Sequence, residues 1–158
     1  MSSRLFQQIR EKEGLAYAVF SFADFFIDTG IFGAYVGADA SQMKRVLQMI
    51  ISAFEHFTSK PVSADELARI KSQLKGNLML SLESTGNRMI RLAKMEIYLD
   101  GYSGLDETIA DIDRVTAEEV QAVARELFDP QKCIITVLGP VREGVITEDD
   151  LYGSVHPS

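Results

Sequence analysis

The spacing of apolar residues predicts that the chain begins with a helix and continues into two strands. Residues 2–13 carry apolar side chains at helical spacing, and Gly14 can adopt the left-handed backbone that ends a helix. Residues 15–22 form an aromatic and β-branched run of strand length, and a second such run covers residues 30–38. We expect these two strands to pair in antiparallel fashion.

The second of these runs carries glycine at alternate positions. Gly33, Tyr35 and Gly37 share one face of the predicted strand. Because glycine has no side chain, that face should leave room for a helix or another backbone to approach.

From residue 41 onward, apolar residues recur at the spacing of a helix. Predicted helices cover residues 41–60, 63–82, 88–99, 105–112 and 116–127, with a break near Gly86. Capping boxes, in which two side chains satisfy each other's free backbone N–H groups, begin the helices at Ser63 and Thr116. Residues 133–138 are almost continuously apolar, so we expect a central strand that is covered on both faces.

This order of elements predicts an α+β fold, with an antiparallel or mixed sheet packed against several helices. We expect one domain over residues 1–140 and an acidic C-terminal tail over residues 141–158. Three strands are few for so many amphipathic helices. The pattern therefore suggests that one or more strands lie outside this chain.

Composition narrows the chemistry. The chain has 158 residues, of which 46% are hydrophobic and 25% charged, as in an ordinary globular domain. Its single cysteine, Cys133, excludes an internal disulfide and a multi-cysteine zinc site. Its two histidines, His56 and His156, are too far apart for the short helical His pair of a catalytic zinc motif. We therefore assign no metal or cofactor ligand in this chain.

The charge and the ends of the chain bear on its partners. The formal net charge is -7, with basic residues scattered among acidic ones, which argues against nucleic acid and anionic membranes as partners. No apolar run reaches the roughly 20 residues that span a bilayer. The first residues lack the features of a signal peptide, so we expect a cytoplasmic location.

Arg10 and Tyr17 form the most suggestive pair of side chains. A reversal at Gly14 would bring the end of the first helix and the start of the first strand together. Both side chains donate hydrogen bonds, and converging donors suit a carbonyl oxygen that gains negative charge. The spacing also allows a simpler interpretation, in which Arg10 pairs with a surface carboxylate and Tyr17 packs in the sheet.

Other candidates have structural explanations. Cys133 lies in the predicted central strand, where a buried thiol is inert. His56 follows an acidic residue near the end of a predicted helix and is expected at the surface or as a cap. His156 falls in the tail, and the Met and Phe stripe over residues 43–57 is expected to be core.

The run SSRLFQQIREKEGLAY at residues 2–17 closely resembles the insulinase/pitrilysin family of zinc metallopeptidases. Its nearest resemblance is to the branch of the mitochondrial processing peptidase and its bacterial relatives. Further agreement lies at residues 28–32, 73–84, 88–89, 112–120 and 137–140. The resemblance covers about residues 2 to 140.

In that family a subunit has two similar α/β halves, and the first half carries zinc on an H-x-x-E-H motif with a more distant Glu. The resemblance implies that this chain is most of a second half, a fragment in which Met1 is an internal residue. The complete enzyme would cleave unfolded peptides or presequences, with zinc bound by the absent N-terminal half. This chain alone would be inactive.

Arg10 and Tyr17 match the family's Arg and Tyr that hold the peptide carbonyl and stabilise the tetrahedral intermediate. The implied partners are the N-terminal zinc-bearing half and a peptide substrate, and exposed apolar surface also suggests dimers or higher homo-oligomers. The alternative is a non-catalytic structural or binding subunit of a processing-peptidase-like complex. The presence of both Arg10 and Tyr17 argues mildly against this alternative.

Overall fold

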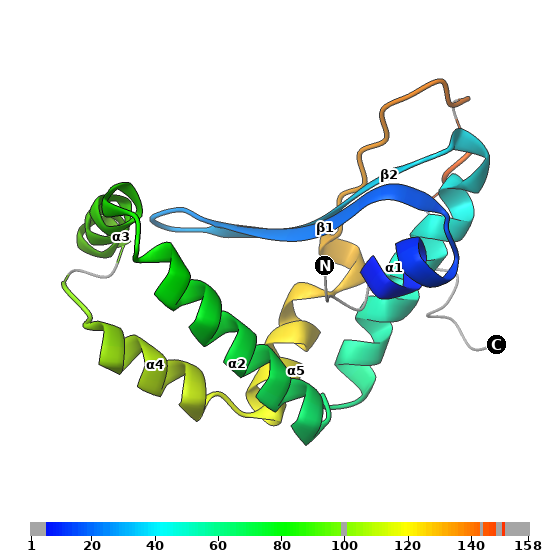
Figure 1. Ribbon diagram of the computed structural model, residues 1–158. Coiled ribbons are helices and arrows are strands. Elements are labelled where there is room, and N and C mark those ends of the chain that lie inside the picture. The colour runs from blue at the N-terminus through cyan, green and yellow to red at the C-terminus, as the bar shows by residue number, and fades with distance from the viewer. Residues whose placement is uncertain (1–5, 99–100, 143, 148–149, 151–158) are drawn as a thin grey trace. The chain divides into compact units, whose positions relative to one another are not determined.

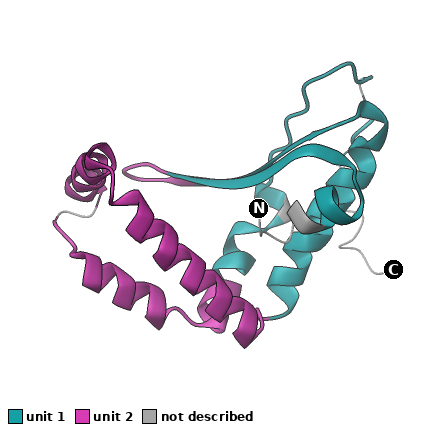
Figure 2. Cartoon of the chain, in the orientation of Figure 1, with its two compact units in different colours: residues 1–24, 31–60, 123–158 teal, residues 25–30, 61–122 magenta. Residues whose placement is uncertain are grey.

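The computed structural model describes residues 6–98, 101–142, 144–147 and 150 (Figure 1). Five α-helices, three short helices of other types and one two-stranded sheet make up this part of the chain. The α+β prediction is confirmed. The chain divides into two compact units (Figure 2). Unit 1 contains the described parts of residues 1–24, 31–60 and 123–158, and unit 2 contains those of residues 25–30 and 61–122.

The first described element of unit 1 is a helix wider than an α-helix. This helix, η1 (Phe6–Lys12), is a π-helix, and the Glu13 N–H donates to the Gln8 carbonyl five residues back at 3.2 Å. Gly14 follows with φ +62°, which confirms the predicted left-handed stop. Residues 2–5 of the predicted helix lie outside the described residues. Apolar spacing predicted a helix here but not its π width.

A long hairpin follows, and Figure 1 shows its two strands side by side. Strand β1 (Ala16–Phe25) runs three residues further than the predicted 15–22, because the apolar residues after Phe22 continue the strand. Strand β2 (Gly30–Ala38) has the predicted bounds. The Phe26 N–H donates to the Thr29 carbonyl at 2.9 Å and closes the loop between them.

The glycine-bearing face of β2 is covered by aromatic rings from β1. The Phe22 ring lies against Gly33, and the Tyr17 ring lies against Gly37. Between these contacts, Phe20 stacks on Tyr35 with ring centroids 4.9 Å apart. The expectation of a helix or another backbone beside these glycines is therefore wrong, because neighbouring side chains fill the space first.

The core of unit 1 lies between the hairpin and helix α1 (Met43–Ser59). Its buried side chains are Ile9, Ala16, Val19, Val46 and Ala53, flanked by partly buried Met49, Ile50 and Phe54. The stripe over residues 43–57 therefore contributes to the core, as its helical spacing indicated. Burying this apolar surface drives the packing of α1 against the hairpin.

Aromatic rings extend this core toward the C-terminal part of unit 1. Phe54 of α1 stacks on Phe128, with centroids 4.2 Å apart and planes 4° apart. Phe32 of β2 lies 5.4 Å from the Phe128 ring. Phe128 follows helix α5 (Ala117–Leu127), and Arg125 of that helix donates from Nε to the Thr58 carbonyl at 3.0 Å. This bond satisfies a carbonyl in the last turn of α1.

Unit 2 contains helices α2 (Ala64–Ser81), α3 (Thr85–Tyr98), α4 (Leu105–Arg114) and the first part of α5. Ser63 Oγ accepts from the Glu66 N–H at 3.3 Å, as the first capping box predicted. In the second, the Thr116 N–H donates to Glu119 at 2.8 Å and the Glu119 N–H donates to Thr116 Oγ1 at 3.2 Å. Both capping boxes therefore begin helices, and the second is fully reciprocal.

The break between α2 and α3 falls earlier than predicted. Gly86 lies inside α3, and the interruption covers residues 82–84. Ser84 Oγ accepts from the Asn87 N–H at 3.4 Å and so starts the new helix.

Helix α4 is held to α2 by Asp113. Its Oδ1 pairs with Lys75 Nζ at 2.7 Å, and its carbonyl accepts from Lys71 Nζ at 2.8 Å.

The predicted strand over residues 133–138 is absent from the structure. This segment has no regular secondary structure, and Ile134 and Leu138 are 91% and 100% exposed. A strand needs a neighbour to pair its backbone groups. Among the described residues, the sheet consists of β1 and β2 alone, so residues 133–138 have no neighbouring strand with which to pair.

The helices of the described residues include none with the length and apolar character of a membrane span.

The predicted tail over residues 141–158 is described only in part. Within it, Asp150 pairs with Lys44 of α1 at 3.2 Å, and hydrogen bonds from Thr147 and Lys44 lower the pKa of Asp150.

Asp39 caps the short helix η2 (Ala40–Gln42), which leads into α1. Its carboxylate accepts from the Ser41 hydroxyl at 2.6 Å and from the Ser41 N–H at 2.8 Å, and these bonds lower the pKa of Asp39 from its ordinary value of 3.8. Because the folded state lowers the pKa of this carboxyl, the charged Asp39 stabilises the fold at pH values above the ordinary pKa of 3.8. This stabilisation is lost as the pH falls through the folded-state pKa.

Asp39→Asn is therefore expected to lower the unfolding free energy at neutral pH. The difference from the wild type should shrink as the pH falls below 3.8, the ordinary pKa of this carboxyl. Urea unfolding followed by far-UV circular dichroism across this range checks it. A difference that does not change with pH would show that the carboxylate charge contributes nothing to this cap.

Candidate functional site

Arg10 and Tyr17 each follow a buried core residue. Arg10 comes after Ile9, which is 0% exposed, and Tyr17 comes after Ala16, which is also buried. Ile9 and Ala16 belong to the same buried cluster, and the Leu15 N–H donates to the Ile9 carbonyl at 2.9 Å. The reversal at Gly14 therefore brings the backbone at both positions to the same end of β1, as the sequence predicted.

Both side chains lie at the surface of unit 1. Arg10 is exposed on η1, and Tyr17 is 70% exposed on β1. The Tyr17 ring nonetheless has a defined neighbour, because it lies on the backbone of Gly37 in β2. A guanidinium and a phenol are both hydrogen-bond donors.

The position of Tyr17 depends on an offset in the strand pairing. Tyr17 and Phe20 are three residues apart, yet their rings contact Gly37 and Tyr35, which share a face of β2. Since alternate residues of a regular strand point to opposite faces, the alternation of β1 shifts by one residue between these positions. Sequence alternation alone gave no signal of this shift.

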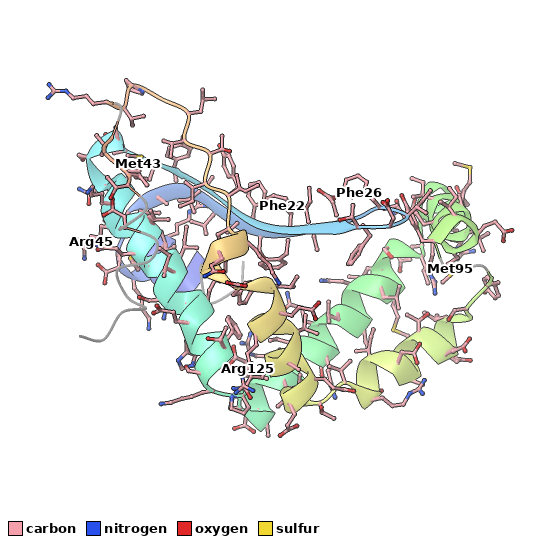
Figure 3. The ribbon with its side chains drawn as sticks, turned by 180° about the vertical axis from the view of Figure 1, so that it is seen from behind. Phe22, Phe26, Met43, Arg45, Met95 and Arg125 are labelled. Atoms are coloured by element: carbon pink, nitrogen blue, oxygen red, sulfur yellow. The ribbon has the colours of Figure 1, made fainter. Side chains whose placement is uncertain are left out.

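Unit 1 also has a surface groove that includes neither residue of this pair. The groove has a volume of about 380 Å³ and lies between η1 and α1. Its lining residues are Gln8, Lys12, Glu13, Arg45, Gln48, Met49 and Ser52, so neither Arg10 nor Tyr17 contributes to it. Arg45 of α1, labelled in Figure 3, pairs with the Glu13 carboxylate across the groove. The sequence gave no signal of this pair, whose partners are 32 residues apart.

The donor set of the described residues does not fit a zinc site. Among them, no group of three or more His, Cys, Asp or Glu side chains comes together. His56 is exposed in the last turn of α1, where the sequence predicted a surface or capping histidine. His156 lies outside the described residues.

Cys133 is exposed, so the prediction of a buried thiol is wrong. The cause is the missing strand, since residues 133–138 have no sheet to bury them. Partial desolvation of the thiol and the nearby Asp129 carboxylate raise the pKa of Cys133. The thiolate form of Cys133 is therefore disfavoured.

Comparison with known proteins gives these features a family context. Residues 1–74 match the family described as the peptidase M16 inactive domain. The chain is 39% identical to an uncharacterized zinc protease of Streptomyces coelicolor, over 90% of this chain and 31% of that protein. It is 41% identical to an uncharacterized zinc protease of Bacillus subtilis, over 81% of this chain and 31% of that protein.

Solved structures agree. A peptidase M16 inactive domain from Pseudomonas fluorescens matches 78% of this chain and 29% of that chain, with a TM-score of 0.69 and 25% identity. A protease from Helicobacter pylori matches the fold with a TM-score of 0.70 at 22% identity, over 81% of this chain and 31% of that one.

The chain is therefore similar to the M16 family of peptidases, and the resemblance to the insulinase/pitrilysin family is confirmed. Within that family it matches the inactive domain, and the matched residues include both Arg10 and Tyr17. The chain spans about a third of the length of the curated relatives described above. The particular branch, that of the processing peptidases, stays a prediction.

Two contacts could hold η1, the helix that carries Arg10, against α1. They differ in how much free energy each contributes to stability. Ile9 is fully buried, and truncating such a side chain costs about 2–5 kcal/mol. The Arg45–Glu13 pair has both side chains at least 40% exposed, and such pairs contribute less than about 1 kcal/mol. Burial of Ile9 is therefore the contact that fixes the helix.

Ile9→Ala should lower the unfolding free energy by about 3 kcal/mol, and Arg45→Met by less than about 1 kcal/mol. Urea unfolding of the two variants beside the wild type measures both values. If Arg45→Met cost as much as Ile9→Ala, the ion pair and not the core would be what fixes η1.

Proposed function

We propose that this chain is the non-zinc half of a zinc metalloendopeptidase that cleaves unfolded peptides or presequences. In this role the chain binds substrate and contributes hydrogen-bond donors but no metal ligands. The placement of Arg10 and Tyr17 carries the proposal. Both side chains are exposed at one end of β1, next to residues fixed in the core.

The family supports the peptidase assignment. The bacterial relatives named above carry the name zinc protease, and the inactive domain that matches this chain includes the predicted pair. Since the described residues do not gather a zinc donor set, we propose that the zinc is bound by an N-terminal half of the complete protein. Zinc would supply Lewis-acid activation there.

The proposed work of this chain is to hold the peptide. Arg10 donates from its guanidinium and Tyr17 from its phenol to the carbonyl oxygen of the bond to be cleaved. Each donor strengthens its bond as that oxygen gains negative charge, so the effect is larger in the transition state than in the bound substrate. Such a donor is worth about 2.7–4 kcal/mol.

The test uses the full-length protein with a peptide substrate. Tyr17→Phe and Arg10→Ala should each lower kcat by about ten- to a thousandfold, because each removes a donor to the developing negative charge. Tyr35→Phe and Lys12→Ala are matched controls. The first removes a phenol hydroxyl from the same face of the hairpin, and the second removes a basic side chain from the same helix.

The controls are expected to stay within about twofold of the wild type. If both site variants kept full kcat, the proposed role of the pair would be wrong. If the controls lost as much as the site variants, the effect would belong to the hairpin and helix in general.

The alternative is a non-catalytic structural or binding subunit of a processing-peptidase-like complex. Zinc content separates the two. The peptidase proposal expects about one zinc per full-length protein, because a catalytic site of this kind binds one ion. Inductively coupled plasma mass spectrometry of the purified protein measures it, and a zinc-free protein without peptidase activity would favour the alternative.

The proposed partners follow from the same assignment. They are the N-terminal zinc-bearing half, the peptide substrate and a second copy of the protein. Apolar side chains left exposed over residues 133–138 support further association. A cytoplasmic location also stays a prediction.

A further inference from the structure

We propose that Gly37 is a positioning residue for Tyr17. In this proposal the glycine gives the phenol the space it needs to donate to the peptide carbonyl. The inference rests on the proposed function, because it assigns a second residue to the same site. It goes beyond the predicted pair, since the sequence had assigned Gly37 only an open face.

The contact is close and involves the reactive end of the ring. A Cβ added at Gly37 would lie nearest to Tyr17 Cε2, 2.5 Å from Cζ and 2.8 Å from the phenol oxygen. Carbon atoms at such distances overlap, so any other residue at position 37 displaces the ring. The phenol group itself is therefore what Gly37 accommodates.

The backbone at Gly37 does not itself require glycine. Gly14, Gly101, Gly139 and Gly144 are the described glycines with positive φ, and Gly37 is not among them. Gly37 lies in β2, whose extended backbone any residue can adopt. The need for glycine at position 37 thus comes from the Tyr17 ring that lies against it and not from the backbone conformation.

The ring can move away if the space is lost. Tyr17 is 70% exposed, so its position is not fixed by a surrounding core. A methyl group at position 37 should push the ring toward solvent at little cost to the fold. The expected consequence is a misplaced phenol in a folded protein, and a misplacement of about 1 Å can cost 10²-fold in rate.

The same strand offers a matched comparison at Gly33. A Cβ at Gly33 would lie nearest to Phe22 Cζ, 2.8 Å from Cε1 and 3.1 Å from Cε2. Phe22, labelled on the hairpin in Figure 3, has no hydroxyl to donate. Aromatic rings over glycines also stabilise strand pairing in general. Gly33→Ala therefore reports this general effect without touching the proposed donor.

The experiment compares Gly37→Ala, Gly33→Ala, Tyr17→Phe and the double variant Tyr17→Phe/Gly37→Ala in the full-length protein. Gly37→Ala should lower kcat by about tenfold or more with a smaller change in KM, whereas Gly33→Ala should stay within about twofold. The double variant should be no slower than Tyr17→Phe alone, because the glycine acts only through the phenol.

A direct measure of ring position accompanies the kinetics. With 3-fluorotyrosine incorporated, the Tyr17 fluorine resonance, assigned by its loss in Tyr17→Phe, should shift in Gly37→Ala and stay in place in Gly33→Ala. Thermal unfolding midpoints of the two glycine variants should agree within a few degrees, since both create the same kind of overlap.

The outcomes separate the two proposals. If Tyr17→Phe lowers kcat but Gly37→Ala does not, the positioning role is overturned and the proposed function stands. If Tyr17→Phe leaves kcat unchanged, the proposed role of Tyr17 fails, and the positioning role fails with it. An unmoved fluorine resonance, an additive double variant, or a Gly37→Ala protein that does not fold would each overturn the inference.

Discussion

Burial of Ile9 is the contact on which the site of this chain depends. Ile9 lies in one apolar cluster with Ala16 and Val19 of the hairpin and with Val46 and Ala53 of α1. Ile9 and Ala16 come directly before Arg10 and Tyr17. Burial of Ile9 and Ala16 therefore fixes the positions from which the side chains of Arg10 and Tyr17 project at the surface. The Arg45–Glu13 pair lies nearby, but exposed ions are too well solvated to fix a helix.

The hairpin has two faces with different tasks. Val19 packs on α1, while Tyr17, Phe20 and Phe22 lie over the glycine-bearing face of β2. That second face is held by ring contacts, and its aromatic side chains stay partly exposed. A strand with a buried side and an accessible side gives the phenol a rigid support without covering it.

Local signals in the sequence were sufficient for most elements of the fold. Gly14 ends the first helix, and the boxes at Ser63 and Thr116 begin α2 and α5, because each involves atoms a few residues apart. Residues 133–138 show the limit of such signals. Their composition is that of a central strand, but a strand forms only where distant backbone pairs with it, and the described residues supply no such neighbour.

The sequence by itself determined that the backbone at Arg10 and Tyr17, the residues of the proposed site, would come to the same end of the first strand. The interval from Arg10 to Tyr17, with a left-handed glycine inside it, is short enough to bring both ends together. Only the tertiary structure decided that the Tyr17 ring lies on Gly37 and that the alternation of β1 shifts by one residue. Those features depend on how two strands pair and which side chain reaches a space first, and no local pattern encodes either.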